Sequence, residues 1–157
     1  MKYTMIFTML SLIFCSCGSK KVVSPDAAEG KQLILSHGGG FTGNYNTYFL
    51  LENGQLFKST ETQGVNTSVN ALSKDVTDQI FANYDALGLA DAKVKNYGNL
   101  LYSITMKEGE KSHKISWEKG DNGSEKLQLF YRNVMNQIAL NNASDTTNKK
   151  TTIKAKF

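Results

Sequence analysis

The sequence predicts an α+β domain: a mainly antiparallel sheet of about five strands, built from two hairpins, with two helices packed on one face. Segments rich in aromatic and β-branched residues meet across short turns, which is typical of hairpins. Two other segments repeat apolar residues every three or four positions, which is typical of helices with one buried side. These elements follow in the order strand, hairpin, helix, hairpin, helix over residues 31–140, about 110 residues and enough for a single core.

The first half of this domain contains the first strand and the first hairpin. A run of three apolar residues predicts a strand over 32–36, and a glycine-rich stretch follows it. Residues 44–51 include two tyrosines and a phenylalanine, which suit a pleated surface, and 55–60 form a shorter apolar run. Between them, Asn53 and Gly54 favour a tight turn with positive φ. The two segments are therefore expected to pair.

The second half contains a helix, the second hairpin and a final helix. Ser73 is a suitable N-cap for the first helix, and Gly88 stands where a left-handed C-cap is expected. Residues 100–107 and 113–117 alternate apolar and polar side chains around a Glu-Gly-Glu turn, which predicts a hairpin. Ser124 precedes a second apolar stripe of helical spacing. Both helices can bury their stripes on one face of the sheet.

The N-terminal segment has the pattern of an export signal. A basic residue precedes the apolar run 5–14, which is shorter than the roughly 20 residues that span a bilayer. The residues Phe-Cys-Ser-Cys-Gly-Ser over 14–19 resemble the end of a bacterial lipoprotein signal peptide. In that family the peptidase cuts before a cysteine that receives a diacylglycerol, and Cys17 follows the small Ser16. The resemblance implies a signal peptide over 1–16 and a membrane anchor on Cys17. An ordinary secretory signal and an uncleaved anchor are the alternatives.

The lipoprotein interpretation has consequences for the rest of the chain. Cys15 leaves with the signal peptide and Cys17 carries acyl chains such as palmitate, so the mature protein has no free thiol for catalysis or disulfides. Residues 17–30 lack apolar periodicity and are expected to form a flexible tether. Residues 141–157 are rich in Thr, Asn and Lys and are expected to be disordered. Ser19, in place of aspartate, resembles lipoproteins sent to the outer membrane of Gram-negative cells.

The net charge does not indicate a nucleic-acid partner. The formal charge is +4 and the pI is about 9.0, but residues 31–140 contain ten lysines and one arginine against eleven acidic residues. The predicted domain is therefore neutral, and the excess lies near the two ends of the chain. Lys20 and Lys21, beside the expected lipid, can contact anionic headgroups.

The glycine-rich stretch is the candidate partner-binding loop, and it consists of Gly38, Gly39, Gly40, Phe41, Thr42 and Gly43. Three of its glycines match the dinucleotide-binding pattern formally. That pattern needs a helix after the third glycine, whereas a strand is expected here, so no cofactor is predicted. The glycines are expected to permit turn geometry. Alternatively, the loop presents Phe41 to a groove on a partner.

Other candidate chemistry is sparse. His37 and His113 are the two histidines, and neither lies at a ligand spacing from another histidine or a carboxylate cluster, so no metal site is predicted. Trp117 is a candidate for stacking on a ligand, with core packing as its alternative. No catalytic residue is assigned, because no nucleophile-elbow pattern is present. Paired carboxylates for glycoside hydrolysis assemble in space, so they stay open.

Residues 39–43 have the sequence Gly-Gly-Phe-Thr-Gly. The chain resembles emfourin-type proteins in this segment and in the order of its predicted elements over about 110 residues. Emfourin-type proteins are small inhibitors of thermolysin-like metallopeptidases. The resemblance implies an inhibitor and carries over no contact residues. We therefore expect an envelope lipoprotein that binds a protein or small ligand without catalysis. Peptidase inhibition is the more specific version of this expectation. An envelope hydrolase that acts on a polymer or glycan is the alternative.

Overall fold

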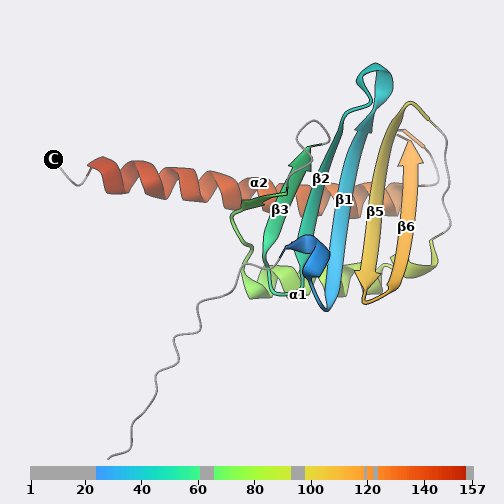
Figure 1. The fold of residues 1–157 in the computed structure, drawn as a ribbon, viewed down its shortest axis with the longest axis horizontal. Coiled ribbons are helices and arrows are strands. Elements are labelled where there is room, and N and C mark those ends of the chain that lie inside the picture. Colours follow the sequence, from blue (N-terminus) through green and yellow to red (C-terminus); the bar gives the residue numbers. More distant parts are fainter. Residues whose placement is uncertain (1–23, 61–65, 93–97, 119, 122–123, 155–157) are drawn as a thin grey trace, which may run out of the picture.

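The computed structural model describes residues 24–60, 66–92, 98–118, 120–121 and 124–154, and it shows a six-stranded antiparallel sheet with two helices on one face (Figure 1). The strands are β1 (Lys31–Gly39), β2 (Tyr45–Leu51), β3 (Leu56–Thr60), β4 (Thr67–Val69), β5 (Leu100–Glu108) and β6 (Lys111–Glu118). The helices are α1 (Lys74–Ala86) and α2 (Glu125–Lys154). The predicted α+β class is confirmed, with six strands rather than about five. The additional strand β4 has three residues, too few to produce an alternating pattern.

The sheet has the order β4-β3-β2-β1-β5-β6, so the first strand lies at its centre. β1 pairs with β2 on one side and with β5 on the other, and it extends to Gly39, beyond the predicted end at Ser36. The extra residues are held by both neighbours: His37 lies opposite Asn46 on β2 and Tyr102 on β5. Pairing on two sides therefore continues the strand into a glycine-rich segment that sequence propensity assigns to a loop.

The core lies between the sheet and the two helices. Alternate side chains of the strands face the helices in rows across the sheet, and the fully buried ones include Leu33, Leu35, Leu50, Ile104 and Ile115. Nearer to the β1–β2 loop, His37 and Tyr102 are only half-buried, although Trp117 in the same row is buried. The end of the sheet near this loop is therefore less covered than its centre.

The chain enters the domain at the opposite end of β1. A short 3-10 helix η1 (Pro25–Ala27) packs on the sheet face away from the helices (Figure 1), and its Pro25 is buried. The buried side-chain amide of Gln32 donates a hydrogen bond of 3.1 Å to the carbonyl of Pro25. Within the segment 17–30, for which the sequence predicts a flexible tether, the burial of Pro25 and this hydrogen bond join the part from Ser24 onward to the sheet. Cys17 lies outside the described residues.

Helix α2 is longer than its apolar stripe. It runs to Lys154 and continues past the edge of the sheet (Figure 1), into the segment for which the sequence predicts disorder from 141 onward. Each residue added to a formed helix gains a backbone hydrogen bond, and a polar segment can therefore continue it. The side-chain amide of Asn141 also donates to the carbonyls of Asn70 at 3.0 Å and Ala71 at 3.2 Å. Residues 155–157 lie outside the described part of the chain.

Candidate functional site

The loop between β1 and β2 is fixed by its glycines. Gly38 has no room for a side chain, because an added Cβ would collide with the backbone of Asn44 and Tyr45. Gly39 has φ of 106°, a conformation that other residues rarely adopt, and its Cβ would meet the carbonyl oxygen of Asn99. Backbone hydrogen bonds join Gly39 to Asn44 and Gly40 to Asn99. The glycines therefore serve the turn geometry that was one of the two interpretations of this stretch.

The other interpretation concerned Phe41, and the structure exposes this side chain completely. Phe41 occupies the middle of the 3-10 turn η2 (Gly40–Thr42), which Gly43 closes with a backbone hydrogen bond to Gly40. The loop stands at the end of β1 opposite η1 (Figure 1). Nine residues of β1 separate these two ends, or about 27 Å of strand. The hydrogen-bonded turn therefore holds the large apolar side chain of Phe41 in solvent.

A cluster of rings lies on the helix face of the sheet near this loop. His37, Tyr102 and Trp117 occupy adjacent positions on β1, β5 and β6, and their rings are nearly parallel, with centroids 6.1 and 5.9 Å apart. Tyr131 of α2 stands edge-on to all three, at centroid distances between 5.4 and 6.3 Å. Edge-to-face geometry of this kind is favourable for aromatic pairs. The cluster joins α2 to three strands.

A hydrogen bond of 2.7 Å connects Nδ1 of His37 to the hydroxyl of Tyr131. Burial raises the pKa of Tyr131, and the nearby Tyr102 and Tyr48 add to the shift. The pKa of His37 is lowered, first by burial and then by the positive charge of Lys58. Both groups are therefore neutral at pH 7. The Tyr131 hydroxyl can then donate to Nδ1, which leaves the proton of the imidazole on Nε2.

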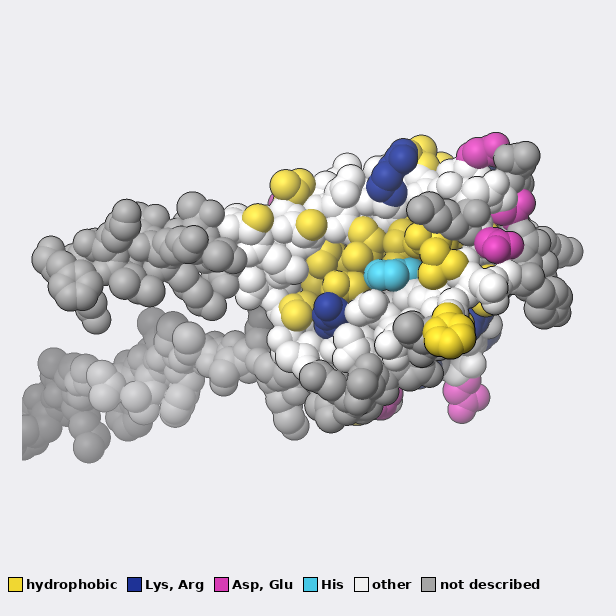
Figure 2. All heavy atoms as spheres, turned by 90° about the horizontal axis from the view of Figure 1, so that it is seen from above, with side chains coloured by type: hydrophobic (Ala, Val, Ile, Leu, Met, Phe, Trp, Pro, Cys, Tyr) yellow, Lys and Arg dark blue, Asp and Glu magenta, His cyan; other side chains and the backbone are white. Residues whose placement is uncertain are grey.

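Beside this cluster lies a pocket of about 320 Å³ between α2 and the sheet, which we call the aromatic hollow. It is lined by Tyr102, Trp117, Gln128, Tyr131, Arg132, Met135 and Asn136. Figure 2 shows apolar side chains gathered in a depression that contains a histidine, with a Lys or Arg side chain on either side. The ammonium of Lys58 lies 5.7 Å from the ring centroid of Tyr48. The hollow thus combines aromatic lining residues with the guanidinium of Arg132, while Lys58 lies beside Tyr48, outside the lining.

Trp117 is 1% exposed, so it packs in the core, which was the alternative to ligand stacking. The reason is Tyr131, whose ring centroid lies 5.8 Å from that of Trp117 and which approaches from α2. Trp117 lines the hollow from beneath, while the half-buried Tyr102 is more accessible. A direct role of Trp117 in ligand stacking stays a prediction.

The second histidine belongs to a different part of the sheet. His113 lies opposite Met106 on β5, and its Nδ1 is 3.3 Å from the hydroxyl of the buried Tyr84 on α1. Burial raises the pKa of Tyr84, and the charge of Asp85 adds to it. Within the described ranges, no three His, Cys, Asp or Glu side chains gather in a metal-binding arrangement.

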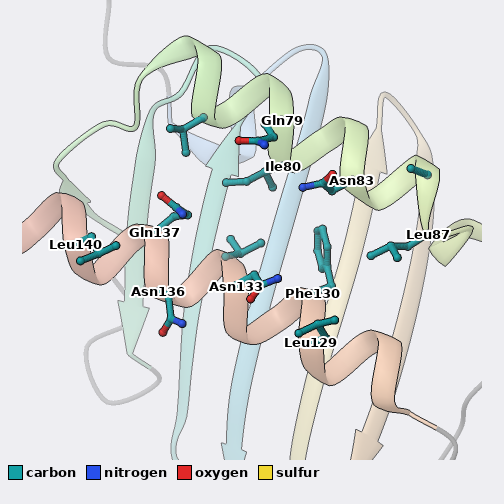
Figure 3. Close-up of a pocket in the computed structure, with 13 residues that line it drawn as sticks. Gln79, Ile80, Asn83, Leu87, Leu129, Phe130, Asn133, Asn136, Gln137 and Leu140 are labelled. Atoms are coloured by element: carbon teal, nitrogen blue, oxygen red, sulfur yellow. The ribbon is translucent and has the colours of Figure 1, made fainter.

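A groove of about 610 Å³ lies between α1 and α2 (Figure 3). Its apolar floor includes Ile80 and Val134, and side-chain amides such as Asn83, Asn133 and Gln137 line its walls. None of its lining residues is ionisable. These residues can donate and accept hydrogen bonds, but they supply no acid or base.

Comparison with known proteins gives no identification. The sequence matches no family model, and no curated protein matches it significantly. Within the described residues, no helix is long and apolar enough to cross a membrane. Function must therefore be inferred from the loop and the hollow themselves.

Sequence reasoning missed most of the hollow. The helical spacing of the last segment places Tyr131 and Met135 beside its apolar stripe, but it gives no sign that these residues line a pocket together with Arg132. The alternation of the second hairpin correctly placed Tyr102 and Trp117 on the helix face. The position of His37 beside them depends on the pairing of β1 with β5, which are more than 60 residues apart in the chain. No local pattern reports such a pairing.

Proposed function

We propose that the protein is an exported lipoprotein, anchored to the membrane through Cys17, that binds a protein partner with the β1–β2 loop and performs no catalysis. The observation that carries this proposal is the complete exposure of Phe41 on a glycine-fixed turn. Large aromatic side chains that fill a pocket on a partner contribute much of the affinity of many interfaces. The partner is expected to offer an apolar cleft that accepts a protruding loop.

The rigidity of the loop supports this role. Burying a phenylalanine side chain contributes about 1.5–3 kcal/mol. A flexible loop loses part of this gain when it becomes ordered on binding, whereas a loop that is already ordered does not. The close approach of Gly38 to Asn44 and the bond from Gly40 to Asn99 order this loop before binding.

The direction of the loop also supports it. Ser24 lies seven positions after Cys17 in the chain, so the anchor can lie at most about 24 Å from the start of the described domain. The domain is entered at η1, and the loop stands at the other end of β1 (Figure 1). An anchor on Cys17 would therefore leave Phe41 directed away from the membrane and accessible to a partner.

The anchor is tested by intact mass and membrane fractionation of the native chain and of Cys17→Ala in a host that processes lipoproteins. The native chain is expected to gain the mass of a lipidated cysteine and to sediment with membranes, whereas the variant should do neither. Equal masses and equal fractionation would contradict the anchor.

The loop is tested by photo-crosslinking in intact cells. Benzoylphenylalanine is introduced at position 41, where it keeps an aromatic side chain, and in a matched chain at the exposed Glu110 in the β5–β6 turn. We expect a defined adduct from position 41 and none of the same mass from position 110. The same adduct from both positions, or none from either, would count against a partner at the loop.

A further inference from the structure

We infer that the aromatic hollow is a second, separate binding site that takes a small aromatic anion. Its three features are an apolar pocket of suitable volume, a floor that is ordered in advance, and an exposed arginine that forms no ion pair with any residue the structure describes. None of them depends on Phe41 or on a protein partner. The inference therefore goes beyond the proposed function.

The volume and lining fit the apolar part of such a ligand. At about 320 Å³ the hollow lies at the small end of ligand pockets, which range over about 300–1,000 Å³. The half-buried Tyr102 offers aromatic surface, and the half-buried Met135 offers a flexible thioether that adapts to irregular shapes. One or two fused or linked rings can be accommodated by these side chains.

The floor of the hollow is held by Tyr131. This ring is 7% exposed, packs edge-on against the rings of Tyr102 and Trp117, and is hydrogen-bonded through its hydroxyl to His37. A bound ring therefore meets a surface that needs no rearrangement, which lowers the cost of binding. His37 does not line the hollow itself, and it contributes through this hydrogen bond, which fixes the orientation of the Tyr131 ring.

The charge of the ligand follows from Arg132, the charged residue of the lining, whereas Lys58 lies outside the lining. Arg132 lines the hollow and is exposed, and Lys58 lies close enough to lower the pKa of His37. Among the described residues neither forms an ion pair. The lining residues include no carboxylate. Glu118, which follows Trp117, alternates to the opposite face of the sheet. The charged side chain of the lining is therefore a cation, and its planar guanidinium is well suited to a carboxylate or sulfonate.

Two dyes test the inference: 8-anilinonaphthalene-1-sulfonate, an aromatic anion, and N-phenyl-1-naphthylamine, its uncharged analogue. Each is titrated into the full chain carrying Cys17→Ala, which removes the proposed lipid. Trp117 is the only tryptophan, so energy transfer from it reports dye bound near the hollow. We expect saturable binding of the anion and binding of the neutral dye that is at least several-fold weaker.

Variants locate the site. Arg132→Gln is expected to weaken the anionic dye about fivefold, the upper end for one exposed ion pair, and to leave the neutral dye unchanged. Lys126→Gln removes a charge from an exposed position of α2 that does not line the hollow, and should change neither dye. Met135→Phe fills the hollow and should weaken both. Circular dichroism verifies that each variant is folded.

Three results would overturn the inference. The first is equal affinity for the two dyes, which indicates general apolar adhesion. The second is an equal effect of Arg132→Gln and Lys126→Gln, which indicates bulk charge. The third is unchanged binding in folded Met135→Phe, which places the dye elsewhere. Since Phe41 lies outside the lining, these results are independent of the outcome of crosslinking at the loop.

Discussion

Replacing Tyr131 with phenylalanine removes the hydroxyl that bonds Nδ1 of His37 and keeps the ring that packs against Tyr102 and Trp117. The aromatic packing is therefore retained, and the free energy of the hydrogen bond is isolated. A buried hydrogen bond contributes about 0.5–1.5 kcal/mol, and an acceptor left unpaired in a dry site costs about 1–3 kcal/mol. Because His37 is only half-buried, water can reach Nδ1 in the variant. We expect a loss of about 1 kcal/mol.

Equilibrium unfolding in urea measures this loss. With a slope of about 2 kcal/mol/M, the midpoint of Tyr131→Phe should fall by about 0.5 M at pH 7.5. His37→Phe and the double variant complete a double-mutant cycle, whose coupling energy should also be about 1 kcal/mol. A coupling energy near zero would refute the stabilising hydrogen bond, and a loss above about 3 kcal/mol would show that the ring itself had moved.

Three further predictions concern residues of β1 and its loop. The pKa of His37 is lowered on folding from its ordinary value of 6.5, so its contribution to stability is complete above 6.5 and is lost as pH falls toward the folded pKa. The urea midpoint should therefore drop between about pH 7.5 and pH 5.5, and less so in His37→Gln; equal drops would contradict this. Gly38→Ala places a methyl group against the backbone of Asn44 and should cost about 1–3 kcal/mol by the same assay, so an unchanged midpoint would disprove the close approach. Phe41→Ala should change stability by less than about 0.5 kcal/mol, because the side chain is fully exposed; a larger loss would mean that the ring packs on its own domain.

The elements of this fold could be predicted where the pattern is local. The hairpin around Gly109 and the helix that begins after Ser73 were both recognisable, since alternation, capping and turn residues lie within a few positions of each other. Strand β4 escaped prediction because it has three residues and is held by β3. The extension of α2 to Lys154 was not predicted, because composition indicates only which structure a segment favours by itself. It does not take account of the helix that precedes the segment and that the segment can continue.

The features of the candidate site also divide into those that a local sequence pattern predicts and those that depend on residues far apart in the chain. The exposure of Phe41 could be expected from the sequence, because glycines stand close to it on both sides in the chain. The burial of Trp117 could not, because it depends on Tyr131 approaching from a helix that follows in the chain. The partnership of His37 with Tyr131 joins residues 94 positions apart, and only the assembled sheet and helix bring them together.

Binding through the loop is tested most directly by an affinity measurement. The partner captured at position 41 is purified, and its affinity for the native chain is compared with its affinity for Phe41→Ala. The variant should retain the unfolding midpoint of the native chain and bind at least tenfold more weakly, the loss expected when an interface anchor is truncated. Equal affinities of two equally stable chains would contradict the proposal that Phe41 anchors the partner.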